Sequence, residues 1–407
     1  MKVLQVNCVY RKGSTGKIMY DLHTAFEENQ IDSVICYGRG EKLEGAYKTC
    51  SELYSKVNNL RSRFTGIMYG GCFFSTNRLI RIIKKERPDI VHLHCINGYF
   101  VNIYRLVTWL KKSGICTVLT LHAELMHTAN CGHAFECEKW KTGCHGCERY
   151  KKETRSILLN RTHVSWKRMK KAFDGFEKLE VVSVSPWLME RAAQSPILGK
   201  LSHNVILNGI DTDTFRPSDT EELRKKYASD GEKLVFFVTA AFVTDPGHAK
   251  GGYYLLELAK RMKGEKVRFL VAAGTCEANV AWPENVMFLG SIRDQTLLAQ
   301  YYAAADACLL VSKKETFSMP TAESLSCGTP VVGFEAGAPE TITLKEYSRF
   351  VPYGDVDALQ KALGDVLNSE KEPQIAEKAA TKYNKKRMAE EYIRLYHKML
   401  KSGENHE

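Results

Sequence analysis

Short runs of β-branched and other apolar residues alternate with amphipathic stretches along the chain, and this alternation predicts parallel β-sheets. In the first half, the runs that predict strands are residues 2–7, 32–37, 89–94, 116–121, 181–184 and 204–207. Between them, helical periodicity marks residues 17–28, 76–86 and 99–112. A strand, an amphipathic helix and a second strand form the βαβ unit, in which the two strands run parallel.

A second series of the same kind begins near residue 233. Its predicted strands are 234–240, 267–273, 286–289, 307–311 and 330–333, and its predicted helices are 253–262, 295–303 and 321–326. The polar segment 208–218, which contains Gly and Pro, reads as a linker. Residues 372–400 have the apolar period of one long helix. We therefore expect an α/β protein of two doubly wound, parallel-sheet, Rossmann-like domains that face a cleft, with residues 1–207 in one and 208–384 in the other. The helix 385–407 is expected to pack back on the first domain.

Composition narrows the class of protein. Hydrophobic residues make up 44% and charged residues 26% of the 407, the mix of a folded chain rather than a disordered one. No window of eighteen uninterrupted apolar residues occurs, and the start reads as a first strand rather than a secretion signal. The net charge of +11 favours anionic partners, with a solvated basic surface as the alternative. No RNA- or DNA-binding module appears, so nucleic acid is not expected.

The strongest local feature is a pair of carboxylates, Glu315 and Glu323, eight residues apart in SKKETFSMPTAESLSCGTPVVG. The first would follow a strand, and the second would lie in the first turn of the next helix. Backbone N–H groups at such a helix start suit a phosphate, and a carboxylate nearby can accept two sugar hydroxyls. The alternative is one capping and one solvated glutamate.

Six segments resemble, in order, the motifs of glycosyltransferase family 4, whose members are retaining GT-B enzymes that use nucleotide-sugar donors. The acidic pair resembles the E-x7-E motif of that family. The other five are Gly13-Ser14-Thr15-Gly16, His122 at the end of VLTLH (with Ala123 where Asp is common), Ser185 in VSVSPWL, the segment ILNGIDTDTF, and Gly247-His248-Ala249-Lys250-Gly251.

The resemblance implies a role for each matched residue. Lys250 would bind the departing diphosphate without a catalytic metal, Glu315 would contact the donor sugar, and Glu323 would hold the ribose. His122 would act on the sugar or the developing charge. Donor-contacting residues would also be Gly13, Gly16, Thr316, Phe317, Ser318, Met319 and Thr321. The second phosphate clamp of many members, an arginine, is absent from TAAFVTDPGHAK, and Arg293 is the candidate substitute.

Thirteen cysteines raise a separate question. Nine are scattered, mostly in apolar segments, and read as reduced thiols of a cytoplasmic protein. The other four lie in one stretch of seventeen residues that follows His122, namely Cys131, Cys137, Cys144 and Cys147. The last two form C-x2-C. A structural zinc site of four thiolates, free thiols and disulfides are all open, with zinc preferred. A similar cysteine-bearing insertion, with the WKTGC stretch, is found in colanic-acid-type polysaccharide glycosyltransferases. We expect zinc to hold an insertion that lacks a core of its own.

Residues 163–178 carry basic positions on one side and Trp166, Met169, Phe173 and Phe176 on another. This pattern fits an interfacial helix on an anionic membrane, or a helix whose apolar stripe packs into the first domain, which we prefer. The resulting hypothesis is a retaining glycosyltransferase that moves a sugar from a nucleotide-sugar donor to a saccharide or lipid-linked acceptor of surface or exopolysaccharide. It would work in the cytoplasm, at the inner face of the membrane. The alternatives are a non-catalytic, zinc-stabilised scaffold and another GT-B-like enzyme such as a phosphorylase.

Overall fold

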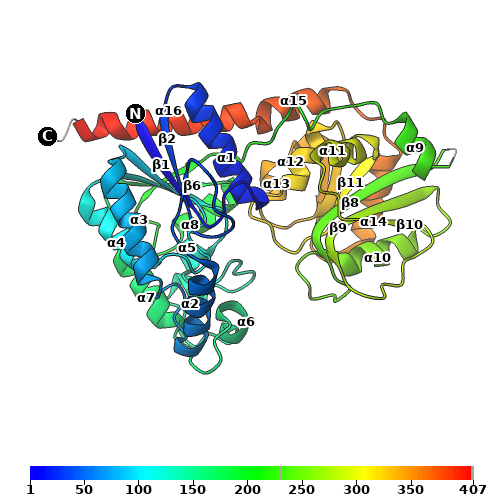
Figure 1. The fold of residues 1–407 in the computed structure, drawn as a ribbon. Coiled ribbons are helices and arrows are strands. Elements are labelled where there is room, and N and C mark those ends of the chain that lie inside the picture. The colour runs from blue at the N-terminus through cyan, green and yellow to red at the C-terminus, as the bar shows by residue number, and fades with distance from the viewer. Residues whose placement is uncertain (230, 405–407) are drawn as a thin grey trace. The chain divides into compact units, whose positions relative to one another are not determined.

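The computed structural model describes residues 1–229 and 231–404, which fold into two α/β units. Of the described residues, the first unit contains 1–208 and 388–404, and the second contains those between 209 and 387. In each unit the strands form a single sheet in which all pairs run parallel. The prediction of two parallel-sheet α/β domains is confirmed (Figure 1).

The sheet of the first unit has seven strands in the order β3-β2-β1-β4-β5-β6-β7. Their bounds are β1 Lys2–Asn7, β2 Asp32–Tyr37, β3 Ala46–Lys48, β4 Ile90–Leu93, β5 Cys116–Leu121, β6 Leu179–Ser183 and β7 Ser202–Val205. Six of the seven match predicted runs. The edge strand β3 was not predicted because three residues are too few to show an alternation of apolar and polar positions.

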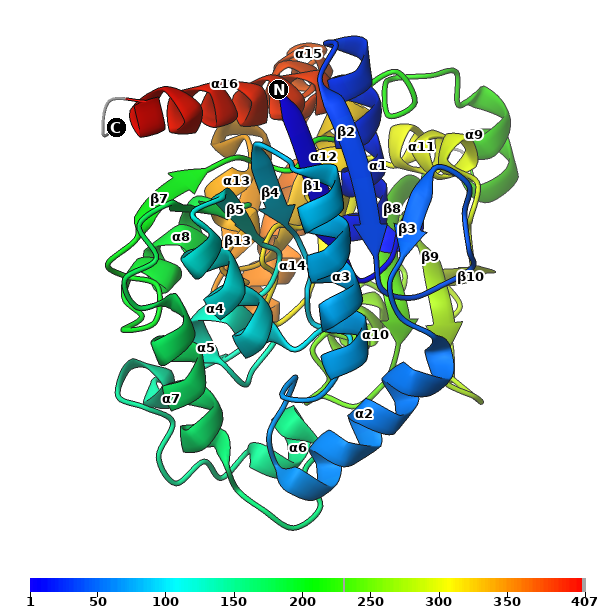
Figure 2. The same cartoon turned by 60° about the vertical axis from the view of Figure 1, so that its left-hand side comes forward.

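Helices cover both faces of this sheet. On one face, α1 (Gly13–Glu28) and α16 (Lys385–Glu404) share a core cluster with β1, β4, β5 and β6. On the other, α3 (Phe73–Glu86) and α4 (Ile103–Ser113) pack side by side (Figure 2). The remaining elements are α2 Glu52–Thr65, α5 Leu125–Thr128, η1 Lys139–Lys141, α6 Tyr150–Thr154, α7 Thr162–Phe173 and α8 Pro186–Ala193. This is the doubly wound arrangement that the sequence predicts.

Helix α7 decides one of the open alternatives. Its apolar positions Trp166, Met169 and Phe173 are buried, as is Phe176 just beyond it, and α7 packs against α4. The interfacial-helix interpretation of residues 163–178 is therefore wrong, because the apolar stripe that would enter a membrane is already covered. The alternative, packing into the first domain, is confirmed.

The second unit has six strands in the order β10-β9-β8-β11-β12-β13. Their bounds are β8 Lys233–Phe242, β9 Val267–Cys276, β10 Val286–Gly290, β11 Ala307–Leu310, β12 Val331–Phe334 and β13 Ser348–Val351. The edge strand β13 was not predicted. The helices are α9 Glu221–Tyr227, α10 Gly252–Arg261, α11 Gln295–Ala304, α12 Met319–Ser326, α13 Pro339–Ile342, η2 Lys345–Tyr347, α14 Val356–Leu367 and α15 Gln374–Tyr383. Leucines of α10 and α14 pack with β8, β9, β11 and β12 in one core cluster.

The single C-terminal helix expected over residues 372–400 is two helices, α15 and α16. Asn384 between them is extended, with ψ 133°, because it pairs with Ile210. The Ile210 N–H donates to the Tyr383 carbonyl, and the Lys385 N–H donates to the Ile210 carbonyl. A Cβ on Gly209 would lie 2.4 Å from Lys385 Cα, so this close approach requires glycine.

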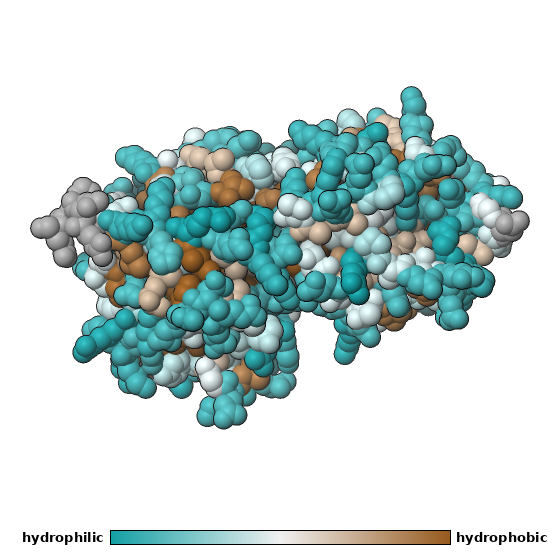
Figure 3. Space-filling view, turned by 90° about the horizontal axis from the view of Figure 1, so that it is seen from above, coloured by the Kyte–Doolittle hydropathy of each residue, from teal (hydrophilic) through white to brown (hydrophobic). Residues whose placement is uncertain are grey.

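The surface drawn in Figure 3 is mostly hydrophilic, with hydrophobic side chains in smaller areas between. Within the described residues, every helix is too short or too polar to span a bilayer.

Candidate functional site

The central pair of the predicted donor site is formed within the second unit. Lys250 follows β8 and Glu315 follows β11, and these strands are neighbours in the sheet. The Lys250 Nζ lies 2.7 Å from Glu315 Oε1, with 35% and 18% of the two side chains exposed. An ammonium and a carboxylate that the sequence separates by 65 residues therefore meet at the carboxyl edge of this sheet. In open α/β sheets, ligands bind outside this edge.

The loop that carries Lys250 is held by close backbone contacts. Gly251 has φ +71°, and a Cβ at this position would lie 2.0 Å from the Val311 carbonyl oxygen. The Lys313 N–H donates to the Ala249 carbonyl over 2.8 Å. Only glycine tolerates both this φ and this approach, so the Lys-Gly sequence fixes Lys250 against the chain that leads to Glu315.

Glu315 is fixed from the other side by the chain after β12. Its N–H donates to the Ala336 carbonyl, and its carbonyl accepts from the Ala338 N–H. The Glu340 carboxylate in turn accepts from the N–H groups of Ala336 and Gly337. Two backbone hydrogen bonds to the loop after β12 thus hold Glu315, which preorganises its carboxylate.

The start of α12 differs from the expectation of several N–H groups open to a phosphate. Ser318, at φ +85°, caps the helix, and its hydroxyl accepts from the Thr321 N–H over 3.3 Å. The next-to-first helical residue is Pro320, which has no N–H. Thr321 is buried and its amide is already bonded, so the prediction that its N–H faces a ligand is wrong. Thr316, Phe317 and Met319 complete the turn, and Phe317 is buried.

Glu323 lies in the second turn of α12, one turn further along than predicted. Its Oε2 accepts from the Tyr302 hydroxyl over 3.0 Å. Burial and the neighbouring Glu323 carboxylate raise the pKa of Tyr302 well above its ordinary value, so the hydroxyl stays protonated and a donor. Glu323 is half-buried, which leaves part of the residue open to a polar ligand.

Arg293 is not brought to this pair. It lies exposed between β10 and α11, and β10 is the edge strand, two positions away from β8. Among the described residues, no hydrogen bond or ion pair joins the Arg293 side chain to Lys250 or Glu315. Its role as a second phosphate clamp stays a prediction.

In the first unit, Gly13 and Gly16 belong to the first turn of α1 rather than to a loop. Gly13 has φ +66° and open space around it, whereas a Cβ on Gly16 would lie 3.3 Å from the Arg11 nitrogen and the Val9 carbonyl. Gly16 therefore permits a close turn between β1 and α1, and its carbonyl accepts from the Arg11 N–H.

His122, which follows β5, is the end of a row of three histidines. The His92 and His94 ring centroids are 3.9 Å apart, and those of His94 and His122 are 5.7 Å apart. His94 Nε2 lies 3.1 Å from Gln5 Oε1, and its Nδ1 lies 3.4 Å from His122 Nε2. A neutral imidazole has one nitrogen that donates and one that accepts. If His94 donates from Nε2 to Gln5, then His94 Nδ1 accepts from the Nε2–H of His122. His122 Nδ1 is in that case an acceptor.

The protein packed around these rings keeps them neutral. Burial lowers the pKa of His122 to about 4 and those of His92 and His94 well below the ordinary value. Tyr396 of α16 bonds His92 Nδ1 over 2.7 Å. His92 and His94 are fully buried, and His94 also orients His122.

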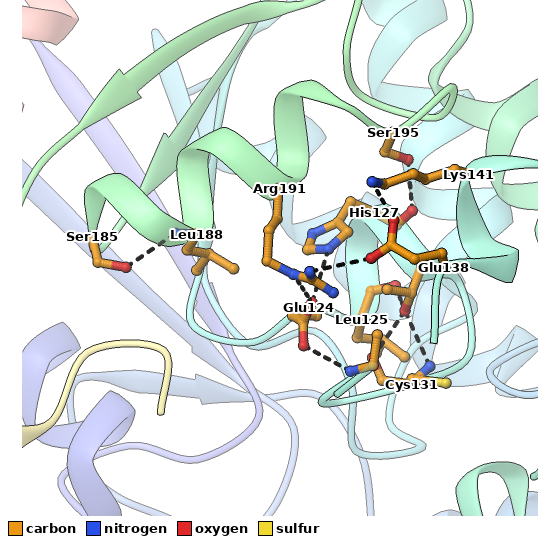
Figure 4. A network of polar contacts seen from close by, with 12 residues as sticks. Glu124, Leu125, His127, Cys131, Glu138, Lys141, Ser185, Leu188, Arg191 and Ser195 are labelled. Atoms are coloured by element: carbon orange, nitrogen blue, oxygen red, sulfur yellow. Dashed lines mark hydrogen bonds and ion pairs between the residues drawn. The ribbon is translucent and has the colours of Figure 1, made fainter. Parts of the chain in front are cut away.

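A buried ionic network beside His122 was missed by sequence reasoning (Figure 4). Glu124 is fully buried, and its carboxylate accepts from Arg191 Nε of α8 over 2.6 Å and from the Ala134 N–H over 2.7 Å. Burial opposes its ionisation, yet the neighbouring His127, the Arg191 charge and the Ala134 amide lower the pKa of Glu124 to about 2. This carboxylate ties the chain after β5 to the cysteine-bearing insertion and to α8.

The insertion has a core, contrary to the expectation. Trp140 is 1% exposed, with its ring against His127 and under the Arg191 guanidinium. The Trp140 carbonyl accepts from Trp166 Nε1 of α7 over 2.8 Å. An aromatic side chain of this size supplies the apolar burial that we expected a metal to replace.

Within the residues that the structure describes, none of the four clustered cysteines forms a disulfide, and all except Cys137 are buried. Among the described residues, no three His, Cys, Asp or Glu side chains are grouped so as to hold a metal ion. Zinc at Cys131, Cys137, Cys144 and Cys147 stays a prediction, and no step below depends on it. Elemental analysis tests it, since one equivalent per chain supports the site and far less, with all four thiols open to alkylation, contradicts it.

The chain is similar to known glycosyltransferases. Residues 233–369, most of the second unit, match the model of the family "Glycosyl transferases group 1". This range contains Lys250, Glu315 and Glu323. The chain is a glycosyltransferase with the GT-B fold, its second unit is similar to this family, and the scaffold and phosphorylase alternatives are not favoured.

One relative and several solved structures are similar to this chain over nearly its whole length. The chain is 23% identical over 421 residues to the colanic acid biosynthesis glycosyl transferase WcaC of Escherichia coli (strain K12), covering 97% of this chain and 99% of the relative. Its fold is similar to that of Anabaena HepE in complex with UDP, with a TM-score of 0.66 at 14% identity over 97% and 99% of the two chains. HepE in complex with UDP-glucose (TM-score 0.62, 14% identity) is covered over 99% and 100% of the chains. A sucrose-phosphate synthase of Thermosynechococcus elongatus is also similar, with a TM-score of 0.65 at 15% identity over 98% and 99%.

Proposed function

We propose that this chain transfers a sugar, with retained anomeric configuration, from a nucleotide-sugar donor to a saccharide or lipid-linked saccharide of surface or exopolysaccharide synthesis. The observation that carries the proposal is the Lys250–Glu315 pair, 2.7 Å apart at the carboxyl edge of the second sheet. UDP and UDP-glucose complexes of HepE and the colanic acid role of WcaC support the donor and acceptor classes.

The pair suits the chemistry of the leaving group. Breaking the bond between the anomeric carbon and the diphosphate leaves at least two negative charges on the phosphate oxygens. In the donor complex, the Lys250 ammonium binds those oxygens, and a charge-assisted bond strengthens as the charge develops. No catalytic metal is needed in this scheme.

The carboxylates act by positioning. Released from Lys250, the Glu315 carboxylate accepts hydroxyls of the donor sugar and sets the anomeric carbon. Glu323, held by Tyr302, accepts the ribose hydroxyls. Both are assigned to binding because the second would lie by the nucleoside, whereas hydrolases place two carboxylates at one glycosidic bond. His122, neutral and oriented by His94, accepts a hydroxyl of the transferred sugar through Nδ1.

The proposed place of work is the cytoplasm, at the inner face of the membrane. All thirteen cysteines lie in the described part of the chain and none forms a disulfide there, which suits a reducing compartment. A lipid-linked acceptor would also bring the enzyme to a membrane surface.

A panel of nucleotide sugars tests the proposal. The correct donor raises the unfolding temperature by mass action, and nucleotide is released when an acceptor is added. Lys250→Met, which keeps a chain of similar length without the charge, loses this thermal shift. If no nucleotide sugar or nucleoside diphosphate stabilises the wild-type chain, the proposal is contradicted.

A further inference from the structure

Helix α2 presents its apolar residues outward. Leu53, Val57, Leu60 and Phe64 follow one another at helical spacing and are 74%, 55%, 51% and 51% exposed. The buried residues of this helix are polar, namely Ser55, Asn58 and Ser62. An amphipathic helix in a folded unit ordinarily buries its apolar stripe, so α2 is inverted.

Hydrogen bonds hold α2 in this orientation. Ser55 Oγ donates to the Gly98 carbonyl over 3.1 Å, and Asn58 Oδ1 accepts from the Cys72 N–H over 2.7 Å. Ser62 Oγ bonds the Tyr99 hydroxyl over 3.2 Å. The polar face is satisfied inside the unit, and the apolar face is left for a partner.

The exposed apolar residues of neighbouring segments extend this face. Phe74, 79% exposed, packs its ring 6.0 Å from that of Tyr54 in α2. The segment 157–159 carries Leu158, 69% exposed, and is tied to the end of α2 by the Ile157 N–H, which donates to the Arg63 carbonyl. We call the set Leu53, Val57, Leu60, Phe64, Phe74 and Leu158 the α2 apolar surface. Large exposed apolar patches of this kind mark interaction sites.

Cations surround this surface. Lys56, Arg61 and Arg63 are exposed on α2 itself. Next to it, a groove of about 970 Å³ between α3 and α4 is lined by five cations and no acid, the cations being Arg81, Lys84, Arg105, Lys112 and Arg168. Within the described chain, none of these five forms an ion pair. Phe73 lines the groove and lies 5.7 Å from the Arg61 guanidinium, so groove and apolar surface adjoin.

We propose that this region of the first unit docks on an anionic phospholipid bilayer. The α2 apolar surface enters the boundary between headgroups and acyl chains, and the groove cations bind lipid phosphates. An apolar stripe flanked by lysine and arginine is the pattern of helices that lie in the membrane interface. The inference deepens the proposed function, on which it rests only in so far as a lipid-linked acceptor lies at a membrane.

Charge favours a bilayer over a second copy of the chain. A symmetric self-contact would bring like cations of two grooves toward each other with no acid in either lining, which is unfavourable. A bilayer supplies both the apolar layer and the negative phosphates that these residues lack.

Flotation of the full chain with vesicles tests the inference. The wild type should float with phosphatidylglycerol-containing vesicles at low salt, less at high salt because screening weakens the phosphate contacts, and little with pure phosphatidylcholine. Leu60→Glu/Phe64→Glu should abolish flotation. Arg81→Gln/Lys84→Gln should lower the partition coefficient by about thirtyfold, since each cation near an anionic leaflet contributes roughly a factor of five.

Matched controls come from the second unit. Met287→Glu/Leu297→Glu makes the same change at two exposed apolar residues, and Lys260→Gln/Lys361→Gln removes two exposed cations. Both should float like the wild type. Circular dichroism and donor-induced thermal shift confirm that each variant is folded.

Three results would overturn the inference. The first is that the wild type does not float with anionic vesicles at low salt. The second is that Leu60→Glu/Phe64→Glu floats like the wild type. The third is that the wild type binds no vesicles and forms a dimer, whereas this variant is a monomer. The donor-induced thermal shift separates the two proposals. Flotation without it contradicts the donor site alone, and the shift without flotation contradicts the membrane surface alone.

Discussion

At the scale of single residues, Glu124 shows how one buried charge can join segments that are distant in the sequence. Its carboxylate joins the chain after His122, the Ala134 amide of the insertion and Arg191 of α8. Removing one partner of a buried pair leaves the other charge uncompensated.

Glu124→Gln should therefore lower the free energy of unfolding by about 3 kcal/mol, measured by urea denaturation at neutral pH. Glu148→Gln, which removes a solvent-exposed partner of Lys139, is the control and should leave stability essentially unchanged. Equal stability of the two variants would show that the Glu124 network does not hold this region.

Because the Glu124 carboxylate must stay ionised to keep its partners, the folded chain should lose stability at acid pH. The pKa of Glu124 is lowered in the folded chain, to about 2 from an ordinary value of 4.5. Its contribution is therefore complete above pH 4.5 and is lost as the pH falls from 4.5 toward 2. Unfolding midpoints measured across this range should fall less steeply in Glu124→Gln than in the wild type. Parallel curves would contradict the assignment.

The pKa of the His122 imidazole gives a second testable prediction. Because burial lowers its pKa to about 4, the ring should be neutral throughout the working pH range. Its imidazole NMR signal, assigned by its loss in His122→Gln, should titrate near pH 4. A midpoint near 6.5 would mean that the ring is solvated and not held against His94.

Residue roles differ in how far the sequence reveals them. Lys250 and Glu315 stand in recognisable motifs, so their proximity could be expected. Glu124 and Arg191 lie 67 residues apart in segments without a motif, and a buried pair of this kind becomes visible only when the fold brings both together.

At the scale of elements, Gly251 illustrates why a loop sequence is restricted. Gly251→Ala would place a Cβ 2.0 Å from the Val311 carbonyl oxygen, at φ +71°. Gly264→Ala has a similar left-handed φ but no atom within 4 Å, and should cost about 1 kcal/mol. Thermal unfolding should show a clearly larger loss for Gly251→Ala, together with loss of donor binding. Similar losses would mean that the loop can move away.

Helices and strands were predictable from the sequence where their buried residues are apolar and form a clear pattern along the chain. Strand β5, Cys116–Leu121, is buried at every position and was predicted to the residue. Helix α2 was not predicted, because its buried face is polar and its apolar residues point outward. The break at Asn384 also escaped, since the pairing with Ile210 that causes it is remote in sequence.

At the scale of the whole molecule, the parallel order of each sheet follows from the βαβ alternation and was predictable from the apolar pattern. The strands β3 and β13 were not, because AYK in β3 is only three residues long and SRFV in β13 has only two apolar residues. The chemistry of the second unit is concentrated where the neighbouring strands β8, β11 and β12 end, since these three strand ends hold Lys250 and Glu315.

The most direct test of this assignment is the rate of sugar transfer by Glu315→Ala with the donor found in the panel. The account predicts a loss of about a hundredfold or more with the fold retained, while Glu265→Ala, at an exposed glutamate of the same unit, transfers like the wild type. Transfer by Glu315→Ala at the wild-type rate would contradict the account.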